Sequence, residues 1–107
     1  VQTCALPILK GLKKIKELKI KSKDVDVRID EYSCEDLVLI LDLQSSLMSA
    51  EATIISALER NESRGAHQRS DFPEINSSYE FNILVKLNKE DLLSSLKACD
   101  SLLGNCL

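Results

Sequence analysis

A run of thirty residues without glycine or proline, from Cys34 to Ser63, constrains the fold of this chain more than any other feature. Ser33 and the acids Glu35 and Asp36 stand at its start, where a hydroxyl can accept from unpaired N–H groups and carboxylates favour the positive end of a helix dipole. Apolar residues recur along the run at helical spacing: Leu37, Leu41, Leu47, Met48, Ile54, Ile55 and Leu58. The run therefore predicts one long helix from about Cys34 to about Ser63.

This helix is apolar on more than one face in its first half, where four further aliphatic residues widen the arc: Val38, Leu39, Ile40 and Leu43. A helix that is apolar over so many faces usually packs on more than one side. Small residues in the middle would let another helix approach closely: Ser45, Ser46, Ser49, Ala50 and Ala52. We therefore expect this helix to need more cover than one short helix can supply.

A shorter helix is predicted from Ile8 to about Ile20, because Ile8, Leu12, Ile15 and Leu18 recur at helical spacing. Lysines occupy its other faces: Lys10, Lys13, Lys14, Lys16 and Lys19. Residues 1–23 carry a net charge of +6, whereas residues 24–107 carry −9. A solvated basic face is the interpretation that we favour. Binding to a membrane surface or a nucleic acid is the alternative, which the absence of interleaved aromatics and arginines weakens.

Two segments alternate with period two. Val25, Val27 and Ile29 predict a half-buried strand or an extended strap, and residues 81–87 predict a strand. Asn88 is placed to begin a last helix over residues 89–104, which has leucines on one side. Because the core must be aliphatic, we predict a mainly α fold in which helix packs on helix, with one or two short extended segments.

The cysteines and the hydropathy exclude several classes of protein. Cys4, Cys34, Cys99 and Cys106 form no C-x-x-C pair, and there is only one histidine, so we predict no metal site and reduced thiols. We find no apolar run of the roughly 20 residues that a membrane helix needs. We therefore expect no direct insertion into a membrane and no nucleic-acid partner.

The stretch ERNESRGAHQRSDFPE, from Glu59 to Glu74, holds three arginines, the only histidine and four acids. Gly65 is predicted to end the long helix, because glycine tolerates a positive φ. A lone histidine without a nucleophile-elbow pattern does not make a catalytic triad. Arg64, His67 and Arg69 could hold a dicarboxylate or a phosphate. They could equally pair with the four acids of the stretch, Glu59, Glu62, Asp71 and Glu74, and fix the loop, and we favour this second interpretation. With no G-x-G-x-x-G, Walker or H-E-x-x-H motif, we assign no catalytic, cofactor-binding or metal-binding residue.

The run SALERNESRGAHQRSDFPE (Ser56–Glu74) closely resembles the signature near the C-terminus of the succinate dehydrogenase and fumarate reductase flavoproteins, a group that includes L-aspartate oxidase. In that family a long helix with an A-E-A-type segment, here residues 50–52, leads into an E-S-R-G-A-H-like turn. A D-[FY]-P-E-like element follows, here residues 71–74. The resemblance covers about residues 9–75.

The resemblance implies the helical C-terminal domain of an FAD-dependent oxidoreductase, a three-helix bundle like a spectrin repeat, packed on a flavin-binding domain and a capping domain. It implies a further partner, an iron–sulfur subunit, and a place in the cytoplasm or at the inner face of a membrane through partner subunits. The FAD-binding and catalytic residues would lie in parts of the enzyme that this chain does not contain, so the fragment alone is expected to be inactive. The turn would then act as a structural support: Glu62, Ser63, Arg64, Gly65, His67, Arg69, Asp71 and Pro73.

The chain divides by this reasoning into three parts. Residues 1–8, VQTCALPI, resemble the translation of a sequencing adapter, and we expect them to be foreign. Residues 9–75 form the helical flavoprotein domain. Residues 76–107 form a divergent strand-plus-helix tail, because they lack the acidic pair and the Asn-Trp or Asn-Phe segment that are common in the family. The alternative function is a free-standing helical module for protein interaction.

Overall fold

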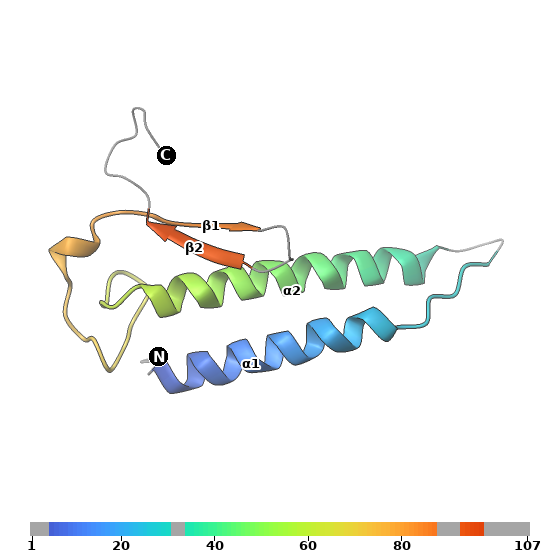
Figure 1. The fold of residues 1–107 in the computed structure, drawn as a ribbon, viewed down its shortest axis with the longest axis horizontal. Coiled ribbons are helices and arrows are strands. Elements are labelled where there is room, and N and C mark those ends of the chain that lie inside the picture. The colour runs from blue at the N-terminus through green and yellow to red at the C-terminus, as the bar shows by residue number, and fades with distance from the viewer. Residues whose placement is uncertain (1–4, 31–33, 88–92, 98–107) are drawn as a thin grey trace, which may run out of the picture.

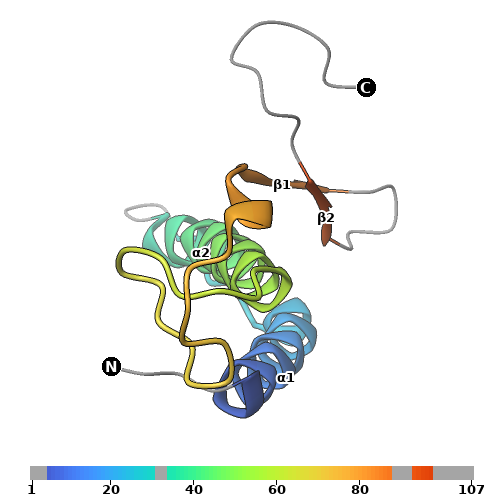
Figure 2. The same cartoon turned by 90° about the vertical axis from the view of Figure 1, so that its left-hand side faces the viewer.

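The computed structural model describes residues 5–30, 34–87 and 93–97. Two antiparallel helices dominate it, α1 (Ala5–Lys21) and α2 (Glu35–Glu59), which lie side by side in both views (Figures 1 and 2). The remaining elements are two single 3-10 turns, η1 (Ser22–Asp24) and η2 (Ser77–Tyr79), and two strands, β1 (Ile83–Leu87) and β2 (Leu93–Lys97). The prediction of a mainly α fold is confirmed. Of the three helices expected for a bundle, the described residues contain two.

The two helices approach closely at Gly11 of α1. A Cβ atom added at Gly11 of α1 would lie 3.4 Å from the Cδ1 atom of Ile54 in α2. Leu47 is the one large aliphatic side chain that is buried among the described residues, at 6% exposure. The helix pair therefore builds a thin seam rather than a full core.

One ion pair crosses this seam. The Nζ atom of Lys19 in α1 donates to the Oε2 atom of Glu51 in α2 at 2.7 Å. The side chain of Glu51 is 2% exposed and that of Lys19 is 26% exposed. Because a buried carboxylate without a partner is costly, this pair favours one register of α1 along α2.

The end of α2 differs from the prediction. The helix begins within one residue of the predicted start, but it ends at Glu59 rather than near Ser63, because Arg60 is already extended (φ −81°, ψ 103°). Gly65 is therefore not the residue that ends the helix. Its positive φ of 58° serves a tight turn further along the chain. Ser33, the predicted N-terminal cap, lies outside the described residues.

Residues 25–30 lie in the connection from α1 to α2 and form an extended strap. Among the described residues, this strap belongs to no sheet. Val25 and Ile29 are 49% and 63% exposed, so only Val27 is half-buried. The N–H group of Arg28 donates to the Oδ2 atom of Asp36 at 3.2 Å, which ties the strap to the first turn of α2.

The predicted strand over residues 81–87 is confirmed at Ile83–Leu87, but the predicted last helix is wrong over residues 93–97. Strand β2 pairs antiparallel with β1, with Ile83 opposite Lys97 and Leu87 opposite Leu93. Pairing with a neighbouring strand outweighs the helical spacing of the leucines here. The rest of residues 89–104 lies outside the described part. The β1–β2 pair lies against α2, on a different side from α1 (Figures 1 and 2).

Helix α2 is long and apolar enough to cross a membrane, judged by length and composition alone. Helices in the core of proteins pass the same test, so the finding is weak evidence. The buried Glu51–Lys19 pair, the packing of α1 and the β1–β2 pair along the helix favour a helix that packs on protein.

Candidate functional site

The segment that follows α2, residues 60–76, folds into a compact loop that we call the arginine turn. Its backbone is closed by hydrogen bonds from Ser63 N to Glu74 O at 3.1 Å and between Arg64 and His67 in both directions, at 2.8 and 3.0 Å. Two residues, Gly65 and Ala66, therefore connect Arg64 to His67. Two-residue turns of this kind need a positive φ at the first central residue, which glycine supplies without strain.

Arg69 lies at the centre of the turn, with 4% of its surface exposed. Its Nη1 atom lies 3.0 Å from the carbonyl oxygen of Leu58, 3.1 Å from that of Arg60 and 3.0 Å from Oδ1 of Asn61. The last carbonyls of an α-helix have no partner within the helix. The guanidinium group therefore caps α2 from a position nine or more residues later in the sequence.

The other edge of the same guanidinium group faces Asp71. Its Nε atom donates to Oδ1 of Asp71 at 3.0 Å, and Nη2 donates to Oδ2. The ring of Phe72 lies under the group, with 4.6 Å between the ring centroid and the Cζ atom. This fork is a bidentate charge-assisted contact, which a lysine could not reproduce.

Ser63 fastens the two ends of the loop. Its hydroxyl group accepts from the N–H of Arg69 at 2.8 Å and lies 2.8 Å from the carbonyl oxygen of Phe72 and 3.1 Å from that of Arg69. The residue is 4% exposed. A hydroxyl that serves as donor and acceptor at once leaves no buried polar atom unsatisfied at this point.

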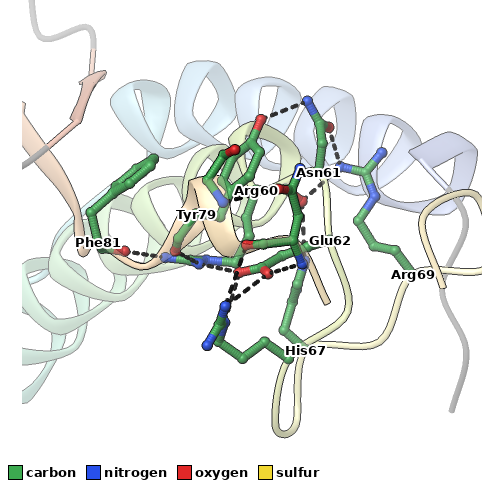
Figure 3. Close-up of polar contacts among 10 residues, drawn as sticks. Arg60, Asn61, Glu62, His67, Arg69, Tyr79 and Phe81 are labelled. Atoms are coloured by element: carbon green, nitrogen blue, oxygen red, sulfur yellow. Dashed lines mark hydrogen bonds and ion pairs between the residues drawn. The ribbon is translucent and has the colours of Figure 1, made fainter. Parts of the chain in front are cut away.

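Glu62 is the buried acid of the turn and has no surface exposed. Its Oε1 atom accepts from Arg60 Nη1 and from Arg64 Nε at 2.9 Å. Its Oε2 atom accepts from Arg64 Nη2 at 3.2 Å and from the N–H of Asn76 at 2.8 Å. Figure 3 shows this carboxylate surrounded by its donors. A buried charge is tolerated because both oxygens are paired.

These contacts change the ionisation of the turn. Hydrogen bonds from Arg64, Asn76 and Arg60, opposed by burial, lower the pKa of Glu62 from 4.5 to about 2. The hydrogen bond to Glu62 raises the pKa of Arg64 in return. The hydrogen bond from Arg69 lowers the pKa of Asp71, and the N–H groups of Asp71 and Ala5 add to this effect. All three groups are therefore charged at neutral pH.

We expect the stability of the turn to fall as the pH decreases from 4.5 toward 2, because Glu62 has a lower pKa when folded than when unfolded. The stabilisation that ionised Glu62 gives to the folded state is fully present above the unfolded pKa of 4.5. It is lost as the pH falls and the carboxylate of the folded protein becomes protonated. The free energy of unfolding of the Glu62→Gln variant should therefore fall less steeply than that of the wild type as the pH decreases from 4.5 toward 2. Asp26→Asn, at an exposed carboxyl of the strap, is the control. Equal slopes for wild type and Glu62→Gln would contradict the assignment.

Arg60 connects the turn to the segment that leads into β1. Its Nη1 atom donates to the carbonyl oxygen of Tyr79 at 2.9 Å, and Nη2 donates to that of Phe81 at 2.6 Å. The rings of Tyr79 and Phe81 stack with 5.5 Å between centroids, and Asn61 Nδ2 donates to the Tyr79 hydroxyl at 3.2 Å (Figure 3). The carboxylate of Glu62 thus holds a guanidinium group that also fixes residues 79–81.

All eight residues singled out in the sequence lie in this turn, but their roles differ. Glu62, Ser63, Arg69 and Asp71 carry the polar network, and Gly65 makes the tight turn. The Nε2 atom of His67 lies 3.3 Å from the carbonyl oxygen of Arg60.

Arg64 and Pro73 lie nearer the surface, although Arg64 donates twice to the buried Glu62. The side chain of Arg64 is 38% exposed, and Pro73 is exposed. Of the acids expected to pair with arginines, Glu62 and Asp71 do so. Sequence reasoning missed Arg60 as an anchor for residues 79–81, Asn61 as an acceptor for Arg69, and Lys19 as the partner of Glu51, because each depends on a contact distant along the chain.

The three arginines of the turn are engaged by groups of this chain. The guanidinium groups of Arg60, Arg64 and Arg69 all donate to carboxylates and carbonyls of this chain, so binding a phosphate or dicarboxylate would break these contacts. Among the described residues, no group of three or more His, Cys, Asp and Glu side chains could hold a metal ion. Among the described residues, every buried side-chain nitrogen and oxygen atom has a hydrogen-bond partner.

A long helix that is capped by a buried arginine and packed on a second helix defines a mainly helical domain. The family model for the fumarate reductase flavoprotein C-terminal domain matches residues 6–97. The chain therefore belongs to this family. The resemblance seen in the sequence is confirmed.

Individual relatives agree with the family. The chain is 38% identical over 82 residues to an uncharacterised FAD-dependent oxidoreductase of Methanocaldococcus jannaschii. The alignment covers 74% of this chain and 15% of the relative. It is 35% identical over 80 residues to one subunit of the fumarate reductase (CoM/CoB) of Methanothermobacter marburgensis, with coverage of 75% and 15%. It is 43% identical over 61 residues to the succinate dehydrogenase flavoprotein subunit of Rickettsia conorii, with coverage of 54% and 10%.

The fold agrees as well. A solved structure of Mycobacterium smegmatis Sdh1 in complex with UQ1 superimposes with a TM-score of 0.78 at 24% identity, over 92% of this chain and 17% of that one. This likeness shows the fold alone. The chain spans about 15% of the length of the first two relatives.

Proposed function

We propose that this chain is the non-catalytic C-terminal helical domain of an FAD-dependent oxidoreductase of the succinate dehydrogenase or fumarate reductase type, with L-aspartate oxidase in the same group. In the parent enzyme, FAD would take up or give the hydride. The domain would brace the flavin-binding and capping domains of the same chain. An iron–sulfur subunit is a further proposed partner, and the proposed location is the cytoplasm or the inner face of a membrane, reached through partner subunits.

The observation that carries this proposal is the exposed apolar surface of α2. Six large apolar side chains of this helix are at least 38% exposed: Leu37, Val38, Leu39, Leu41, Leu43 and Met48. An open depression of about 380 Å³ lies at the same end, lined by Cys34, Glu35, Val38 and Leu39. Large apolar side chains exposed on several sides of one helix end mark an interface. The part of the relatives that this chain does not span, some 85% of their length, would supply the cover.

The arginine turn has a defined place in this proposal. Its buried charges are fully paired, which makes it a stiff end piece for α2. A stiff end would fix the direction in which α2 leaves the parent domains. Glu62, Ser63, Arg64, Gly65, His67, Arg69, Asp71 and Pro73 would thus act on the active site only through the position of the helix.

A free-standing interaction module is the second candidate, because the same exposed face of α2 would serve a separate protein partner. The two candidates differ in whether the cover belongs to the same polypeptide. In the first case the apolar face of α2 is buried in the full-length protein. In the second it stays accessible until a partner binds.

The test compares the full-length flavoprotein with a Val38→Asp/Leu39→Asp variant. We expect the variant to lose flavin during purification and to lose oxidation of succinate or aspartate, because two charges would be buried in the domain interface. A matched Lys10→Asp/Lys13→Asp variant on exposed positions of α1 is the control for activity. Full flavin content and activity in the α2 variant would contradict the proposal, as would stoichiometric FAD binding by this chain alone.

A further inference from the structure

The segment that follows the arginine turn, residues 77–97, contacts α2 through both of its strands. Ile83 and Val85 of β1 are half-buried, whereas Leu84 between them is 46% exposed. Side chains at alternate positions of a strand share one side, so β1 has a single half-buried side. A pair of strands is marginally stable by itself in water, and packing against a helix stabilises it. The β1–β2 pair therefore depends on its docking to α2.

Arg60, the first residue after α2, makes a polar contact with the start of this segment. Its Nη1 atom donates to the carbonyl oxygen of Tyr79 at 2.9 Å, and its Nη2 atom donates to that of Phe81 at 2.6 Å. The Cζ atom of the same group lies 5.9 Å from the centroid of the Phe81 ring. We call these contacts the Arg60 clamp. Because the guanidinium group is planar and rigid, it fixes both carbonyl groups, and with them the direction in which the chain enters β1.

Glu62 holds the clamp in position. Its Oε1 atom accepts from the same Nη1 atom that donates to Tyr79. The side chain of Glu62 has no surface exposed, and that of Arg60 is 17% exposed. A long arginine side chain loses rotamer freedom when it is ordered, and a buried carboxylate that already holds the group reduces the entropy that docking must remove. Glu62 therefore acts on residues 79–81 through Arg60.

Asn61 provides a second connection, from Arg69 to the same segment. Its Oδ1 atom accepts from Nη1 of Arg69 at 3.0 Å, and its Nδ2 atom donates to the hydroxyl group of Tyr79 at 3.2 Å. A guanidinium group can only donate, so the amide oxygen faces Arg69 and the amide nitrogen faces Tyr79. Figure 3 shows that both connections start in the arginine turn and end at Tyr79 and Phe81.

We propose that Glu62 and Asn61 are positioning residues that set the place of residues 77–97 on α2. Glu62 acts through Arg60, and Asn61 acts through the hydroxyl group of Tyr79. The arginine turn is thus a conformational device with two tasks, because it ends α2 and couples this end to the docking of the β1–β2 pair. Both partners of each contact belong to the described part of this chain, so the coupling does not depend on which surfaces of the domain the parent enzyme covers.

The test is hydrogen exchange of the full-length flavoprotein, read by mass spectrometry over residues 83–87, where exchange reports opening of the β1–β2 pair. We expect Arg60→Gln to raise the exchange rate about tenfold, because hydrogen bonds from a charged group are lost. Tyr79→Phe removes only the hydroxyl group and should raise it roughly three-fold. Glu62→Gln should also raise it, and its effect combined with Arg60→Gln should be smaller than the product of the two, because the variants remove one shared contact.

Arg64→Gln is the matched control, because Arg64 donates to both oxygens of the same Glu62 carboxylate and to the carbonyl oxygen of Asn76, which precedes the segment. This variant should speed exchange within the arginine turn and leave exchange over residues 83–87 within about two-fold of wild type. Exchange in α1 should keep its wild-type rate in the Tyr79→Phe variant.

Three outcomes would overturn the proposal. The first is unchanged exchange over residues 83–87 in both Arg60→Gln and Tyr79→Phe. The second is an equal rise in Arg60→Gln and Arg64→Gln, since the segment would then follow only the general stability of the turn. The third is a rise in α1 as large as that in β1. A failure of the proposed enzyme function would appear separately, as missing flavin in the wild type, and the comparison of exchange rates would still hold.

Discussion

Replacing Arg69 by methionine should lower the free energy of unfolding of this domain by about 3 kcal/mol, the lower end of the range for removal of one partner of a buried ionic contact, because Asp71 is partly exposed. The substitution leaves the carboxylate of Asp71 and the carbonyl oxygens of Leu58 and Arg60 without their donor. The side chain of Asp71 is 28% exposed, so water replaces part of its lost contact, whereas Arg69 is 4% exposed and leaves a buried position without a donor. Urea denaturation, together with hydrogen exchange of the last turn of α2, measures the effect.

Two further variants separate the geometry of the guanidinium group from its charge. Arg69→Lys keeps the positive charge but cannot reach Asp71 and the end of α2 at once, so we expect an intermediate loss of about 2 kcal/mol. Arg28→Met removes an exposed arginine from the strap and should change the stability by less than about 0.5 kcal/mol. If Arg69→Met costs no more than Arg28→Met, the helix cap assigned to Arg69 is wrong.

The start of α2 was predictable from the sequence and its end was not, for the same physical reason. The start depends on local signals, an uninterrupted run and the acids at residues 35–36, which act within one turn. The end depends on Arg69, which returns from ten residues beyond Glu59 to satisfy the open carbonyl groups. No glycine or proline marks this point, so local rules extended the helix to about Ser63 and assigned Gly65 a role that it does not have.

The prediction of a helix over residues 93–97 was wrong for a different reason. Its leucines recur at helical spacing, and a short apolar segment of this kind is ambiguous between helix and strand. The strand form requires a partner, and β1 supplies one in antiparallel register from Ile83 to Leu87. Such pairing is a property of the folded chain, which periodicity within one segment cannot reveal.

The sequence predicted that the candidate site is a self-pairing loop, but it did not predict which residues pair. The alternation of arginines and acids in residues 59–74 predicted a loop that pairs with itself, and the structure contains that loop. The individual pairs follow from the fold: Glu62 receives two arginines because the chain reverses after α2, and Arg60 extends to residues 79–81. Burial makes these pairs specific, and burial is decided by packing.

The seam between the helices gives the second large prediction, a thermodynamic cycle on Lys19 and Glu51. Lys19→Met should destabilise the domain by about 3 kcal/mol, because the carboxylate of Glu51 stays buried after it loses the ammonium group 2.7 Å away.

Glu51→Leu should cost only about 1 kcal/mol, since the partly exposed Lys19 can turn its ammonium group to water. The double variant Lys19→Met/Glu51→Leu should lie within about 1 kcal/mol of wild type, because apolar side chains of similar volume replace the pair. The coupling energy between the two sites is therefore expected to be large and favourable. Lys16→Met, at an exposed lysine of the same helix, is the matched control for loss of charge. Additive effects of the two single variants would contradict a direct contact, and α1 would then owe its register to the close approach of Gly11 to Ile54 rather than to the ion pair.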